Sequence, residues 1–294
     1  MYILNVFVFS FLTHVVSISS KNLLGDGVTN VLGFYTGLRK LCLCRCGITK
    51  NYANHSKSGR SFSNDIYTGY GMPWLATIHT GTTTIRGTLI SDKHVITAAN
   101  PLFRKSASEI VVTLGSQTCK EGSHALNTSV EAILIHPSYS GSVRNNDIAL
   151  LRLRNPIKFS SFISPICMPL YDIGKLDQLA WTASKIKNKS DLCLTRVVTL
   201  PILSSRTCKG NTLFNSSVTL SDKGCLGPLG TKSILCENDI GGPVMTRWAP
   251  TSPFRLAGII TNTSCEEEAS PQFTRTVDNM LWIHENIRDN CQCF

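Results

Sequence analysis

The amino-acid sequence predicts an all-β fold that ends in a single helix. From about residue 61 onward, short runs rich in β-branched residues alternate with turn-forming residues, a spacing typical of β-barrels and sandwiches. The final stretch differs, because apolar residues recur at helical spacing from Asn279 to Ile287. The predicted strands are Trp74 to His79, Gly87 to Ile96, Ile110 to Leu114, Val130 to Ile135, Ala149 to Leu153, Arg196 to Leu200, Pro243 to Met245 and Leu256 to Thr261.

Residues 1–20 predict a signal peptide. An apolar run from Ile3 to Val16 precedes the small residues Ser17-Ile18-Ser19, and this run is too short to span a bilayer comfortably. No later segment of the sequence is apolar for long enough to cross a membrane. We therefore expect a secreted, extracellular chain without membrane insertion.

Residues 21–60 form a short basic leader that contains the closely spaced Cys42, Cys44 and Cys46. Because so short a segment cannot bury a core of its own, we interpret it as a light-chain linker. Residues 61–294 are assigned to a single domain.

The formal net charge of +10 and the pI near 9.1 suit an acidic partner, such as a sulfated glycan, an anionic surface or an acidic protein patch. No long cluster of Lys and Arg stands out, so a solvated surface with scattered charges is the favoured interpretation. No motif indicates nucleic-acid binding.

Twelve cysteines in a secreted chain predict disulfides, although the sequence alone does not give their pairing. A zinc site built from the closely spaced cysteines is the other interpretation. The oxidising compartment and the lack of neighbouring histidines disfavour it, so no metal or cofactor is expected.

Three motifs occur in the order and at the spacing of one known family. They are Ile-Thr-Ala-Ala-Asn-Pro at 96–101, Asn-Asn-Asp-Ile-Ala-Leu-Leu at 145–151 and Cys-Glu-Asn-Asp-Ile-Gly-Gly-Pro at 236–243. Met72-Pro73-Trp74, Gly87 to Ile90, Pro165 to Pro169 and Phe273-Thr274-Arg275 extend the match. The chain resembles the trypsin-like serine proteases over roughly residues 60 to 290, including secreted arthropod members. An accidental match in some other secreted β protein is disfavoured, because one short motif could not give this order. The resemblance implies a double six-stranded β-barrel with a C-terminal helix.

The resemblance places the catalytic histidine, aspartate and serine at Asn100, Asp147 and Ile240. A sec-butyl side chain has no lone pair to attack a carbonyl carbon, and a carboxamide has no nitrogen that titrates near pH 7. Only Asp147 keeps the family's residue, so we expect no serine protease activity from this triad.

The binding apparatus that the resemblance implies is altered as well. Asn238 stands at the oxyanion-hole position where the family has glycine, and its side chain would intrude on that site. Ile234 stands at the floor of the specificity pocket, where no carboxylate remains for a basic substrate side chain. Either Pro271 or Gln272 replaces a glycine that keeps the pocket open, so we expect a plugged pocket.

Activation in the family requires a cut after a basic residue, which frees an ammonium group that pairs with the aspartate before the serine. These positions are Arg60, Ser61 and Asp239. Ser-Phe-Ser-Asn at 61–64 replaces Ile-Val-Gly-Gly, so we expect a weak switch even if Arg60 is cut.

The resemblance also implies three disulfides, namely Cys208 with Cys225, Cys236 with Cys265 and Cys46 with Cys167. Another disulfide of the family, beside the catalytic histidine, would join the positions of Ile85 and Pro101. Neither residue is a cysteine here, so this disulfide is absent. The sequence leaves unassigned Cys42, Cys44, Cys119, Cys193, Cys291 and Cys293.

The sequence contains N-glycosylation sequons, and a glycan on the last of them would stand at the rim of the substrate cleft. They begin at Asn54, Asn127, Asn188, Asn215 and Asn262.

These observations favour a secreted, catalytically inactive serine protease homologue that acts by binding. By resemblance it would be a cofactor, adaptor or decoy in an extracellular proteolytic cascade, for instance in arthropod innate immunity. Its partners would be active serine proteases or their substrates. Three alternatives remain: recognition of an acidic glycan or microbial surface, residual serine-type endopeptidase activity through an unusual nucleophile, and a decaying duplicate without a role.

Overall fold

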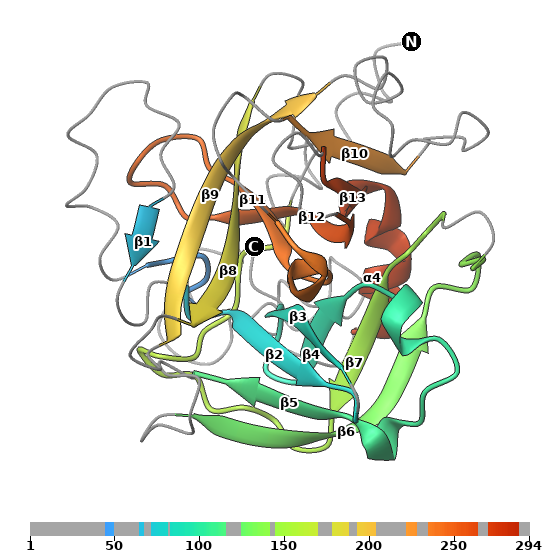
Figure 1. The fold of residues 1–294 in the computed structure, drawn as a ribbon. Coiled ribbons are helices and arrows are strands. Elements are labelled where there is room, and N and C mark those ends of the chain that lie inside the picture. The colour runs from blue at the N-terminus through green and yellow to red at the C-terminus, as the bar shows by residue number, and fades with distance from the viewer. Residues whose placement is uncertain are drawn as a thin grey trace, which may run out of the picture. The chain divides into compact units, whose positions relative to one another are not determined.

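The structure of the chain is a computed structural model (Figure 1) that describes residues 45–49, 65–67, 72–81, 83–115, 125–141, 145–169, 178–187, 193–203, 222–227, 235–263 and 270–287. The all-β prediction is confirmed, because two antiparallel sheets each close into a six-stranded barrel.

The first barrel contains β2 (Leu75–His79), β3 (Thr84–Leu89), β4 (His94–Thr97), β5 (Val111–Leu114), β6 (Leu126–Ile135) and β7 (Ala149–Leu153). Its strand order is β2-β3-β4-β7-β6-β5, and it closes because β2 pairs with both β3 and β5. On β2, Ile78 is buried while His79 is exposed, which is the alternation expected of a strand with one face on a core.

The predicted run from Gly87 to Ile96 is wrong as a single strand, because a tight turn divides it. The backbone N–H groups of Ile90 and Ser91 both donate to the carbonyl of His94, at 3.0 and 3.4 Å. The chain reverses at Ser91 to Lys93, and β3 and β4 then pair antiparallel.

The second barrel contains β8 (Leu179–Lys187), β9 (Cys193–Leu203), β10 (Lys223–Leu226), β11 (Pro243–Thr246), β12 (Arg255–Asn262) and β13 (Gln272–Arg275). Its order is β9-β10-β13-β12-β11-β8, and the pairing of β8 with β9 closes it. A short strand, β1 (Asp65–Tyr67), adds to β9 from outside this closed set. The sequence analysis did not predict β1, β8, β10 or β13.

One hydrophobic cluster contains residues of both barrels, and a second cluster lies within the second barrel. The indole Nε1–H of Trp74, just before β2, donates to Sδ of Met245 in β11 at 3.2 Å, and the Trp74 ring lies 6.0 Å from that of Phe254. The predicted C-terminal helix is present as α4 (Met280–Asn286), which follows the 3₁₀ turn η5 (Val277–Asn279) and buries Ile283 in the first of these clusters. This shared cluster fixes the first barrel against the strands that carry the third motif.

The expected disulfide between Cys46 and Cys167 is present, and it joins the leader to a segment after β7 that bridges to Arg255 at the start of β12. Around it, the N–H of Gly47 donates to the carbonyl of Pro165, and the N–H of Phe254 donates to the carbonyl of Gly47. No helix in the described ranges is long and apolar enough to cross a membrane.

Candidate functional site

The structure brings Asn100 and Asp147 into direct contact. Asn100 opens the 3₁₀ turn η2 (Asn100–Leu102) after β4, and its backbone N–H donates to Oδ1 of Asp147 at 2.8 Å. Asp147 is fully buried just before β7, where Asn146 holds a left-handed φ of 49°. The retained aspartate therefore acts on the backbone of residue 100 and fixes the entry to η2.

The carboxamide of Asn100 is exposed and makes a different contact. The Tyr139 hydroxyl donates to Oδ1 of Asn100 at 3.0 Å, and the Tyr139 ring packs edge-on against Phe103 at 5.7 Å. Sequence reasoning missed Tyr139, because it follows β6 in a segment without a family motif. An amide held by a phenol does not take up protons near pH 7, so this pair offers no general base.

Ile240 follows the 3₁₀ turn η4 (Glu237–Asp239), and both of its backbone polar groups have protein partners. Its N–H donates to the carbonyl of Glu237 at 3.1 Å, and its carbonyl accepts from the N–H of Arg86 in β3 at 2.9 Å. An oxyanion hole requires N–H groups that point at an empty position where charge develops. The N–H of residue 240 is directed instead at a carbonyl within its own turn.

Gly241 has no room for a side chain. Its φ is +85°, and a Cβ would lie 2.1 Å from the carbonyl oxygen of Arg86 and 2.2 Å from Oγ1 of Thr97. On the other side, its N–H donates to the carbonyl of Ile260 in β12 at 2.8 Å, and the Ile260 N–H donates to the carbonyl of Gly242 at 2.9 Å. The Gly-Gly-Pro turn is therefore clamped between β3 and β12.

Asp239 is buried near a half-buried cation, Arg86, that the sequence analysis did not predict. Its Oδ2 accepts from the N–H of Cys236 at 3.0 Å, which caps η4. Arg86, on the adjacent strand β3, donates from Nη1 to Oγ1 of Thr77 at 3.2 Å. Burial lowers the pKa of the Arg86 guanidinium, and the negative charge of Asp239 partly offsets this effect.

A side-chain hydrogen bond joins the end of β12 to Leu235, the residue that follows the expected pocket floor at Ile234. The hydroxyl of Thr263, just after β12, donates to the carbonyl of Leu235 at 2.7 Å, and both residues are buried. Pro271 is buried and Gln272 half-buried at the start of β13. Ile234, the expected floor of the pocket, lies outside the described residues.

Cys225 and Cys236 are both disulfide-bonded, and their expected partners, Cys208 and Cys265, lie outside the described residues. The expected cleavage site also lies outside them, at Arg60 and Ser61. The same holds for the signal peptide, for residues 21–44 of the leader, and for Cys42, Cys44, Cys119, Cys291 and Cys293.

Two sequons lie in the described ranges, at Asn127 and Asn262. Asn127 is exposed at the start of β6, where its Oδ1 accepts from the Thr113 hydroxyl at 2.7 Å. Asn262 is half-buried at the end of β12, opposite Gln272. The remaining sequons, at Asn54, Asn188 and Asn215, lie outside the described residues.

Within the part of the chain that the structure describes, no group of three or more His, Cys, Asp or Glu side chains is placed to hold a metal ion.

Comparison with known proteins identifies the class to which this fold and site belong. The family model described as Trypsin matches residues 63–283, so the chain belongs to the trypsin family of serine proteases. Among its relatives is phenoloxidase-activating factor 3 of Holotrichia diomphalia, 31% identical over 245 residues, which cover 74% of this chain and 69% of that protein. Serine protease 7 of Drosophila melanogaster is 28% identical over 277 residues, or 78% of this chain and 66% of the relative.

A vertebrate relative matches a smaller share of its own length. Vitamin K-dependent protein C of Oryctolagus cuniculus is 26% identical over 217 residues, which cover 68% of this chain but 46% of that protein. The likeness to that protein therefore covers less than half of its length.

Proposed function

We propose that this protein is a secreted, catalytically inactive member of the trypsin family that acts by binding other proteins. The observation that carries the proposal is the residue type and the backbone hydrogen bond at position 240. Isoleucine stands where the family's nucleophile is expected, and its N–H donates to the carbonyl of Glu237 at 3.1 Å instead of facing an oxyanion.

The proton-transfer side supports the same conclusion. Asn100 carries a carboxamide whose oxygen accepts from Tyr139, and Asp147 is engaged by the Asn100 backbone. In a serine protease of a different fold, removing the catalytic serine or histidine alone lowers turnover by about 10⁶. Two such losses in one chain leave no route to an acyl-enzyme.

The pocket geometry favours binding over substrate turnover as well. The hydrogen bond from Thr263 to Leu235 lies next to Ile234, the expected floor of the specificity pocket. A buried hydroxyl that satisfies a buried carbonyl is costly to displace, because both groups would lose their partner. The surface outside the old cleft is therefore where partners would bind.

The names of two relatives and features of the chain itself support a role in an extracellular proteolytic cascade. One relative carries the name phenoloxidase-activating factor, and another is named a serine protease. The predicted signal peptide and the disulfide of Cys46 with Cys167 suit an oxidising extracellular compartment. The partners we propose are active serine proteases or their substrates, toward which this protein would act as a cofactor, adaptor or decoy.

Active-site labelling tests the loss of catalysis directly. The purified chain is incubated with a fluorophosphonate probe before and after limited cleavage, with trypsin as the positive control. We expect no labelling and no hydrolysis of peptide substrates in either state. Covalent labelling of any serine in the folded protein, at a rate comparable with trypsin, would refute the proposal.

The binding role requires a second experiment. The protein is immobilised and exposed to extracellular fluid from its source, and retained proteases and glycans are scored separately. We expect a protease or a protease substrate to be retained. Retention of sulfated glycans alone, with elution by salt, would instead favour surface recognition.

A further inference from the structure

The outer face of the first barrel carries two arginines, Arg152 and Arg154, which are two residues apart at the end of one strand. Arg152 lies on β7, opposite His94 of β4 and Ala132 of β6. Arg154 follows at the end of β7, and its N–H extends the ladder by donating to the carbonyl of Ser129 at 3.0 Å. Leu153 between them is buried, so both arginine side chains lie on the outer side of the strand.

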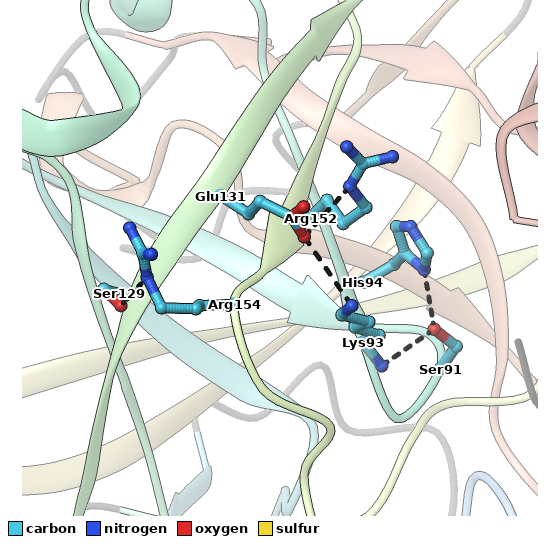
Figure 2. Close-up of polar contacts among 7 residues, drawn as sticks. All are labelled: Ser91, Lys93, His94, Ser129, Glu131, Arg152 and Arg154. Carbon is cyan, nitrogen blue, oxygen red and sulfur yellow. Dashed lines mark hydrogen bonds and ion pairs between the residues drawn. The ribbon is translucent and has the colours of Figure 1, made fainter.

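The Nε atom of each arginine lies near a side-chain oxygen on β6, in a hydrogen bond for Arg154 and in an ion pair without a hydrogen bond for Arg152 (Figure 2). Nε of Arg152 lies 3.3 Å from Oε2 of Glu131, and Nε of Arg154 donates to Oγ of Ser129 at 3.2 Å. Ser129 and Glu131 are two residues apart on β6, and the register between β6 and β7 shifts between Val130 and Ala132, at Glu131. Among the described residues, neither arginine makes a further polar contact through Nη1 or Nη2. The Nη1 and Nη2 groups of both guanidinium forks are therefore available to a ligand.

The charge on this face is positive. Lys93, in the turn before β4, lies 3.6 Å from the same Oε2 of Glu131 that pairs with Arg152. One carboxylate is thus shared by two cations, and Arg154 adds a third positive charge. The side chains of Arg152 and Lys93 are 41% and 25% exposed, so an incoming anion can reach them.

His94, the cross-strand partner of Arg152, is fully buried, with Nδ1 at 3.0 Å from Oγ of Ser91. Burial, and then the positive charges of Arg152 and Lys93, lower the pKa of His94 to about 4. The imidazole is neutral at physiological pH, so the positive charge of this face comes from the lysine and the two arginines alone.

A guanidinium fork pairs with a carboxylate through two parallel N–H···O bonds. Residues two apart on a strand lie roughly 7 Å apart, and so do alternate side chains of an extended peptide. We propose that Arg152 and Arg154 bind an extended acidic segment of a protein partner, with carboxylates at alternate positions. This inference rests on the proposed binding function and names the chemistry of the partner.

Peptide binding tests the proposal. The full chain is titrated into a fluorescein-labelled peptide of alternating Glu and Thr, and into an isomer with the same composition whose Glu residues are contiguous. We expect the alternating peptide to bind several-fold more tightly. Arg152→Gln and Arg154→Gln should each weaken binding about tenfold, since each removes one charge-assisted bidentate pair. Arg154→Lys keeps the charge without the fork and should recover only part of the affinity.

Arg104→Gln is the matched control, because it removes the same charge from an exposed side chain beyond the opposite end of β4. Equal losses in Arg104→Gln and the two face variants would overturn the proposal, as would equal binding of the two isomeric peptides. A sulfated oligosaccharide that binds more tightly than the peptide and depends on the same two arginines would reassign the face to glycans. The fluorophosphonate result is independent of each of these outcomes, so failure here leaves the loss of catalysis standing.

Discussion

The N–H of Arg86 donates to the carbonyl oxygen of Ile240 at 2.9 Å, which ties a strand of the first barrel to the turn expected to carry the nucleophile. The same strand places the Arg86 side chain near the buried Asp239. The position of residue 240 is therefore set by both barrels and by main-chain contacts that do not depend on its side chain.

Ile240→Ser alone is expected to leave the protein without measurable proteolysis. The new hydroxyl would have no imidazole to take its proton, and the N–H of residue 240 would still donate to the carbonyl of Glu237. Hydrolysis of a broad peptide library, followed by mass spectrometry, measures this. The double variant Ile240→Ser with Asn100→His is the comparison, and cleavage by the single variant would show that the missing imidazole and the turned N–H do not block catalysis.

Gly241→Ala is expected to destabilise the fold by about 3 kcal/mol or more. The substitution combines an unfavourable φ of +85° with overlap of its Cβ on the Arg86 carbonyl and the Thr97 hydroxyl. Urea unfolding followed by tryptophan fluorescence measures the difference. Gly81→Ala is the matched control, because Gly81 has a φ of +80° but nothing within 4 Å of its Cβ position. It should cost only about 1–2 kcal/mol, and equal losses at the two sites would remove the steric argument.

Arg86 and Asp239 are expected to be energetically coupled. Arg86→Gln leaves a buried carboxylate without the nearby cation, whereas Asp239→Asn removes the charge but keeps an oxygen that can accept from the N–H of Cys236. A double-mutant cycle should give a coupling free energy of about 1–3 kcal/mol. Strictly additive losses would mean that the two charges do not stabilise one another.

The buried His94 predicts a loss of stability at acidic pH. Its pKa of about 4 in the folded state lies below the ordinary value of 6.5, so below pH 6.5 the unfolded chain binds a proton that the folded chain excludes. The stabilisation is complete above pH 6.5 and declines as the pH falls toward 4, by at most about 3 kcal/mol.

Urea unfolding midpoints test this for the parent chain and for His94→Asn. They are measured between about pH 4.5 and 7.5, at intervals of about half a pH unit. Asn keeps a polar atom for Ser91 but does not titrate. The parent should lose stability more steeply than the variant as the pH falls. Parallel curves would show that His94 is accessible to protons in the folded state.

The sequence predicted the class of fold and the place of the three motifs because those features are local. Strands such as Ala149–Leu153 read as largely apolar runs, in which only Arg152 is charged. β10 could not be predicted in this way, because one of its buried residues is Lys223. The Nζ of Lys223 donates to the Thr274 hydroxyl of β13 at 3.4 Å. The pairing of β10 with a distant strand makes that polar residue acceptable inside the barrel.

At the candidate site, too, local features could be predicted from the sequence, whereas features that depend on tertiary contacts could not. The residue types at positions 100, 147 and 240 can be read directly, and the chemistry that they exclude follows from those types alone. Arg86 and Tyr139 reach the site only through tertiary contacts across β3 and the segment after β6. The hydrogen bond from the Ile240 N–H to Glu237 depends on the 3₁₀ path of η4, which no residue pattern at 237–240 specifies.

The clamp around Gly241 has a consequence for how such a chain can change over time. Main-chain atoms of residues 240 and 241 make the hydrogen bonds to Glu237, Arg86 and Ile260 that hold the turn. The side chain at position 240 can therefore be exchanged in a single step while the turn, the barrels and the surfaces outside the cleft keep their form. A scaffold built in this way can lose a catalytic side chain and still keep the surfaces that contact other proteins.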